Sequence, residues 1–215
     1  QTAVLQQDWA HAQELLPRIP AHQRGKVAKF LESQEMPELA LEVASDPDHR
    51  FDLAVSLGRF DVALDIARSG PASGAEMRWR TIGDRALARW NVPLAQECFE
   101  HASDMHSLFL IATAKRDAGL LRRVAQAART QGELNLAVAA FVQLQDADAL
   151  VDILCDVQRP AEAALYARTY APHLVPRAVD AWKSSFAAQK SAKQQQMGER
   201  IGDPRTEPAS FPELS

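Results

Sequence analysis

The stretch LNLAVAAFVQLQ, residues 134–145, decides the fold class of this chain. It carries no charge between Glu133 and Asp146, and its large apolar side chains leave almost no polar face on a helix. Its length falls short of the roughly 20 residues that a membrane-spanning helix needs. A segment of this kind is typical of a helix that neighbours cover on several sides. Residues 108–114 have the same character, so we expect both segments to be central helices of a larger stack.

The composition agrees with a wholly helical chain. Alanine, the best helix former, supplies 38 of the 215 residues, while only 2 tyrosines are present to favour strands. Hydrophobic residues make up 47 %, enough for a folded core. No run of alternating apolar and polar residues is long enough for a sheet. These features exclude an all-β fold and predict an all-α one.

Chemical markers place the ends of the expected helices. Asp46 followed by Pro47 is typical of a helix start, and Gly58 of the end of the same helix. Asn91 restarts the chain, and Pro160 falls where a first helical turn accepts proline. Residues 69–74, with two glycines and a proline, form the clearest internal loop.

A degenerate repeat runs through these helices. A small residue is followed four positions later by another small or apolar residue, which lets a neighbouring helix approach closely. The pairs are Ala40/Ala44, Ala63/Ala67, Ala95/Phe99, Ala137/Phe141 and Ala163/Ala167, with Leu121/Ala125 on an additional helix. Such a repeat predicts an α-solenoid of stacked helical hairpins, which we assign to residues 1–188. Its irregular period excludes a strict tetratricopeptide array.

The last part of the chain differs in composition. Residues 189–215 are rich in lysine and glutamine and contain three prolines. They offer little apolar surface to offset the entropy of ordering, so we expect an extended or disordered tail. Phe211 and Leu214 are the only large apolar pair near its end, and they could form a short docking motif.

No pattern in the sequence carries catalytic chemistry. A net charge of −4 argues against nucleic acid as a partner, and we find no nucleophile elbow, phosphate loop or dinucleotide fingerprint. Cys98 and His101 share a helix near Asp104 and His106 but lack the second ligand pair of a structural zinc site. We therefore expect no enzyme, no metal, no cofactor and no small-molecule substrate. The two cysteines are interpreted as small buried residues in a reducing compartment.

Aromatic residues provide the candidates for partner binding. Trp79 and Trp90 lie three helical turns apart and would share a face if one helix ran through both, either wedged between repeats or exposed as an anchor. In the last helix, expected at 174–188, one stripe combines Val175, Val179, Trp182 and Phe186. The stripe packs either inward on the preceding hairpin or outward on a partner chain. Because a terminal helix has no following repeat, we take these four residues as the candidate partner site.

Several segments, in order, resemble the helical region of the beta-prime family of coatomer subunits, over residues 5–182. They are LPRIPAHQR at 16–24, VAKFLE at 27–32, ALEVASDPDHRFDLAVSLG at 40–58, LAQECFEHASD at 94–104 and AALYARTYAP at 163–172. In that family two β-propellers carrying the cargo-binding surface precede the helical region. The propeller residues have no counterpart in this sequence.

The resemblance implies a scaffold. Partners would be the alpha subunit of the coat, through its helical region, and other coatomer subunits. A small GTPase would recruit the assembled coat to membranes, giving a cytoplasmic protein that is peripheral on Golgi membranes and on vesicles moving between Golgi and endoplasmic reticulum.

Two alternatives stay open. A peptide-binding adaptor of the tetratricopeptide type would need lysine, arginine or asparagine side chains converging on inner helices, where this chain has apolar residues such as 134–144. A scaffold of the related intraflagellar or nuclear-pore type is a rival within the same class. The missing basic groove favours the scaffold.

Overall fold

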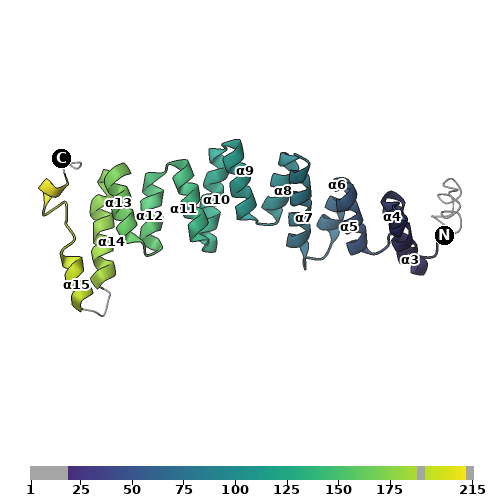
Figure 1. Cartoon of the computed structure of the whole chain (residues 1–215), viewed down its shortest axis with the longest axis horizontal. Helices are drawn as coiled ribbons and strands as arrows, with labels where there is room; N and C mark the ends of the chain where they lie inside the picture. Colours follow the sequence, from purple (N-terminus) through teal and green to yellow (C-terminus); the bar gives the residue numbers. More distant parts are fainter. Residues whose placement is uncertain (1–18, 188–191, 212–215) are drawn as a thin grey trace. The chain divides into compact units, whose positions relative to one another are not determined.

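The computed structural model describes residues 19–187 and 192–211 and contains only helices and turns within them. They fall into two compact units, residues 1–104 and 105–215, and each unit is described by itself (Figure 1). In both units consecutive helices pack against each other as antiparallel hairpins. The expected all-α solenoid of stacked hairpins is confirmed.

The described part of the first unit contains α3 Ala21–Ser33, α4 Pro37–Val43, α5 Pro47–Leu57, α6 Phe60–Ser69, α7 Ala75–Ala88 and α8 Val92–His101. The second contains α9 Met105–Lys115, α10 Ala118–Gln131, α11 Leu134–Leu144, α12 Ala147–Asp156, α13 Pro160–Tyr170, α14 Val175–Ala187 and α15 Ala192–Glu199. Two 3₁₀ turns, Pro172–Leu174 and Pro208–Ser210, belong to the second unit.

The small-residue repeat lines the core of both units. All of its described members are buried, from Ala40 and Ala63 in the first unit to Ala137 and Ala163 in the second, each 0 % exposed. Large side chains fill the remaining space, with Phe99 and Phe141 almost fully enclosed. The prediction that alanines at i and i+4 mark close helix contacts is confirmed.

The turns between hairpin helices are short because one residue serves two helices. The N–H of Asp117 donates to the Ala112 carbonyl (2.9 Å) and closes α9, while its carboxylate accepts from the Leu120 N–H (2.9 Å) and opens α10. Asn91 and Asp146 do the same between α7 and α8 and between α11 and α12. These double roles satisfy backbone groups at both helix ends with very few loop residues.

Most predicted helix limits agree with the structure. Helix α5 begins at Pro47, and Gly58 follows its end in the left-handed conformation, with φ of 73°. The Asp46 side chain makes no capping hydrogen bond, so proline geometry and the backbone carbonyl start this helix. The loop before α7 and the start of α13 at Pro160 also agree.

The two apolar helices are less enclosed than expected. Leu110 of α9 is 66 % exposed and Val142 of α11 is 51 % exposed. In a stack of hairpins each helix contacts only its neighbours in the array, so one side of it remains in water. Both helices are central members of the stack, as expected, but each keeps one large apolar side chain exposed.

The C-terminal segment differs from the expected extended or disordered tail wherever it is described. Residues 192–199 form α15, which packs on α14, and Phe211 is buried. This segment has little apolar surface to bury, but ion pairs with side chains of α14 hold it in place. The division of the chain at residue 188 stays a prediction, since 188–191 lie outside the described residues.

Candidate partner interface

The four residues of the predicted stripe do not share one environment. Val175 and Val179 are buried, at 1 % and 3 % exposed, whereas Trp182 and Phe186 are only partly buried. The stripe therefore begins in the interior of the second unit and reaches the surface towards the end of α14. Of the four, only Trp182 and Phe186 are accessible to a partner in this structure.

Close packing of small residues on α13 fixes the first half of α14. Ala178 on α14 and Ala167 on α13 are each 0 % exposed, and Ala164 is buried beside them. Small side chains let the two helix axes approach, which carries Val175 and Val179 inside.

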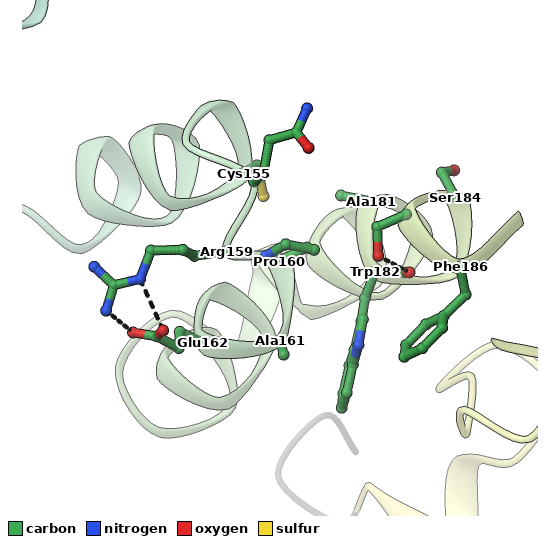
Figure 2. A pocket seen from close by; sticks show the side chains of 11 residues that line it. Cys155, Arg159, Pro160, Ala161, Glu162, Ala181, Trp182, Ser184 and Phe186 are labelled. Carbon is green, nitrogen blue, oxygen red and sulfur yellow. Dashed lines mark hydrogen bonds and ion pairs between the residues drawn. The ribbon is translucent and has the colours of Figure 1, made fainter. Parts of the chain in front are cut away.

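Trp182 and Phe186 border a groove of about 670 Å³. The end of α12, the start of α13 and the last turns of α14 line it. Figure 2 shows the indole of Trp182 and the ring of Phe186 extending from the same side of α14, with Pro160 and Ala161 across from them. An aromatic edge beside an open groove is a common form of protein-binding surface, because tryptophan is enriched among residues that dominate binding energy.

The polar groups of the groove are already engaged. Arg159 donates through Nε to Oε1 of Glu162 (2.7 Å) and through Nη2 to Oε2, and this pairing raises the pKa of Arg159. The hydroxyls of Ser184 and Ser185 donate to backbone carbonyls of their own helix, at 2.8 and 2.7 Å. Burial raises the pKa of the Cys155 thiol, which keeps it protonated at neutral pH. This arrangement suits binding and offers no activated nucleophile.

Three of the four residues considered for a metal site have other partners, and the fourth is a buried thiol. Burial raises the pKa of the Cys98 thiol to about 11, and the ring of His101 stacks on Trp79 at 4.3 Å. Arg80 pairs with Asp104 at 3.1 Å, and His106 with Glu133 at 3.9 Å. Across 19–187 and 192–211, no three or more histidine, cysteine or acidic side chains gather in a way that could hold a metal ion.

Trp79 and Trp90 do not belong to one helix. Trp79 is buried in the hairpin at 7 % exposed, while Trp90 lies after the end of α7, in the left-handed region at φ of 59°, and is 87 % exposed. The condition of one helix through both is not met, because α7 ends at Ala88, where a C-cap turn closes it.

Sequence reasoning missed the contribution of the C-terminal segment to this surface. Met197, Ile201 and Phe211 line a second cavity of about 310 Å³ together with three residues of the stripe, Val175, Val179 and Trp182. Phe211 thus docks on its own chain, while Leu214 lies outside the described residues. The composition of the segment did not predict this contact, because polar side chains make most of the interactions that hold it.

Comparison with known proteins gives the family. Residues 1–183 match the family model described as the COPA/B TPR domain. The chain belongs to this family. Over 214 residues it is 36 % identical to coatomer subunit beta' of Homo sapiens and of Drosophila melanogaster, covering 100 % of this chain. Against coatomer subunit beta'-2 of Oryza sativa the identity is 37 % over 213 residues.

The chain spans only a part of these relatives, 23 % of the human protein and 22 % of the rice one. The matched residues include all of α3 to α13 and most of α14, so the candidate residues Val175, Val179 and Trp182 fall within the family region and Phe186 lies just after it. None of the helices in the described ranges combines the length and the apolar character needed to cross a membrane.

Proposed function

We propose that this chain is a scaffold segment of a vesicle coat subunit, without enzymatic activity, which pairs with the helical region of the alpha coat subunit to build the cage layer of the coat. Its site of action would be the cytoplasmic face of Golgi membranes and of vesicles exchanged with the endoplasmic reticulum. A small GTPase would recruit the assembled coat. The observation that carries the proposal is the 36 % identity to coatomer subunit beta' along the whole chain.

The surface of the second unit supports a role in assembly. Alternate helices expose large apolar residues, between 51 and 66 % exposed: Leu110 on α9, Val142 on α11, and Leu165 and Tyr170 on α13. Repeated modest contacts of this kind can hold elongated chains together through avidity. The pairing of Arg159 with Glu162 leaves the groove beside α14 without the unpaired cation that a peptide-binding adaptor needs. This favours the scaffold over the adaptor.

We place the contact with the alpha subunit at the exposed end of the stripe, at Trp182 and Phe186. The buried half, Val175 and Val179, would join it only if its cover were removed. An anchor of this kind contributes most of the binding energy when water is excluded around it.

The test is co-elution of the full chain with the helical region of the alpha subunit on a size-exclusion column at micromolar concentration. We expect one shared peak. Trp182→Ala should raise the Kd by about 30-fold, the usual loss at an aromatic anchor, with little change in unfolding temperature. Trp90→Ala is the matched control, because Trp90 is more exposed and lies in the other unit. Separate elution peaks for the unmutated chains would contradict the proposal.

A further inference from the structure

The outer face of α14 already has an occupant in this structure, and it is the C-terminal segment of the same chain. Residues 192–211, here called the strap, comprise α15, the turn at 203–207 and the 3₁₀ turn that ends before Phe211. In the strap, Gly198 and Phe211 are buried, although most of the segment is polar.

A glycine makes the first contact of the strap with α14. A Cβ on Gly198 would lie 2.7 Å from the Cβ of Phe186 and 3.6 Å from the Lys183 carbonyl oxygen. Only a residue without a side chain allows α15 to lie this close to α14. The contact is thus specific to this position.

Asp203 makes the second contact. Its carboxylate accepts from the backbone N–H of Arg205 (3.0 Å), from the Arg205 guanidinium (2.9 and 2.8 Å) and from Nζ of Lys183 (3.2 Å). Arg205 in turn pairs with Asp180. Two side chains of α14 are therefore tied to the strap by charge, with Asp203 itself only 8 % exposed.

Phe211 makes the third contact, with α13. Its ring lies 5.2 Å from the Arg168 guanidinium, and Arg168 also donates to the Ser210 carbonyl at 3.1 Å. Between these three contacts lies an open cavity of about 310 Å³, lined by Val175, Val179 and Trp182 and by Met197, Ile201 and Phe211 of the strap.

We propose that the strap is a releasable cover of α14, which opens without unfolding the α13–α14 hairpin and exposes the whole stripe from Val175 to Phe186 to a partner chain. Two observations support release. Charged pairs that are partly open to water hold the strap, and such pairs contribute little individually, whereas buried alanine side chains such as Ala167 and Ala178 hold the hairpin. Segments with few buried apolar contacts open at lower free energy than the core.

The competition with a partner rests on the proposed function, whereas the opening of the strap does not. A partner that replaces the strap must offer the same chemistry: a carboxylate for Lys183 and an aromatic or aliphatic side chain for the cavity.

The test uses the full chain with Val179→Cys, in which the introduced thiol lies under the strap. The variant pair Asp203→Asn and Phe211→Ala removes two of the three contacts. We expect labelling of this thiol by a maleimide, located by peptide mass mapping, to accelerate at least about tenfold. Trypsin cleavage after Arg200 and Arg205 should accelerate with it.

Two controls make the result decisive. Val124→Cys places a thiol in α10, at a buried site outside the strap contacts, and its labelling should not change. Asp61→Asn removes a carboxylate that pairs with an arginine two residues away in the sequence, Arg59, as Asp203 pairs with Arg205, but on an exposed surface. It should leave the labelling of Val179→Cys unchanged. Unchanged labelling of Val179→Cys after loss of Asp203 and Phe211 would overturn the proposal that the strap covers α14. An equal increase at Val124→Cys would overturn release, because the strap would then be part of the core.

Addition of the alpha subunit's helical region separates this proposal from the proposed function. If both hold, the partner should slow labelling of the opened variant again and bind it more tightly than the unmodified chain. If the opened variant is labelled faster but the partner has no effect, the proposal of a releasable strap holds and the proposed function is contradicted. If the partner binds tightly but labelling never changes, the proposal of a releasable strap is contradicted and the proposed function holds.

Discussion

The α7–α8 hairpin and the α14–α15 pair both bring two helices together at a glycine, but different forces hold them. A Cβ on Gly83 of α7 would meet the Phe99 ring at 2.7 Å, just as a Cβ on Gly198 would meet Phe186 at the same distance. Around Gly83 the contact is apolar and closed: Phe99 and Ile82 are 0 % exposed. Around Gly198 the aromatic partner is only partly buried, and ion pairs complete the contact.

The difference separates the permanent parts of the solenoid from the part that can open. Apolar burial stabilises a hairpin at every pH and salt concentration at which the chain is folded. Ion pairs near the surface weaken with salt and with protonation. A glycine at a helix crossing is therefore part of the permanent core at Gly83 and part of a contact that can open at Gly198.

The largest effect on stability should come from Gly83→Ala. The Phe99 ring is fully buried and cannot move away, so overpacking should cost about 1–3 kcal/mol, offset in part by the better helix propensity of alanine. We expect a net loss of about 1–2 kcal/mol in the free energy of unfolding, measured in urea. A gain in stability would show that α7 and α8 are less tightly packed than the structure indicates.

Gly25→Ala is the matched control and should act in the opposite direction. Gly25 lies within α3, and a Cβ there meets nothing within 4 Å. The substitution should raise the free energy of unfolding by about 0.5–1 kcal/mol through helix propensity alone. The same urea titration measures this change. If Gly25→Ala lowered the free energy of unfolding as much as Gly83→Ala, the steric explanation of both substitutions would be contradicted.

Gly198→Ala should change global stability by less than about 0.5 kcal/mol, because the displaced strap leaves the hairpin intact. Its effect should appear in labelling of Val179→Cys, which we expect to accelerate. A large fall in unfolding temperature would instead show that α15 contributes to the core, and the contrast with Gly83 would be contradicted.

Acid should open the strap before it unfolds the hairpins. The Arg205 guanidinium and backbone N–H, with Lys183, hold the pKa of Asp203 well below its usual range. The stabilisation is therefore present above the ordinary aspartate pKa of about 4 and is lost as pH falls below it. Labelling of Val179→Cys with a pyridyl disulfide, which reacts in acid, should be constant from pH 5 to 7 relative to Val124→Cys and rise below about pH 4. Asp203→Asn should abolish this dependence.

Local chemistry made much of the fold predictable. Proline at 47 and 160 and glycine at 58 mark helix limits, because each restricts or permits a particular backbone conformation. Ends without glycine were harder: Trp90 and Gln145 adopt the left-handed region, where the sequence gives no such marker. There the N–H of the following residue, Asn91 or Asp146, donates to the carbonyl five residues back, a local helix-closing bond that accompanies this conformation.

The stripe shows where sequence reasoning stops. Its spacing correctly places four apolar residues along α14, but spacing cannot divide them into a buried and an exposed half. Part of the cover comes from the strap, whose partners are distant in sequence: Asp203 lies 20 residues from Lys183, and Ser210 lies 42 from Arg168. Pairings of polar groups over such separations leave no periodic signal.

The most direct measurement is hydrogen–deuterium exchange of the full chain with and without the helical region of the alpha coat subunit, resolved by peptide. Our account predicts slower exchange in peptides that cover 175–187, together with faster exchange in 192–211 as the strap is displaced. Protection confined to residues 19–104, or no protection anywhere, would contradict the claim that the α14 face holds the partner.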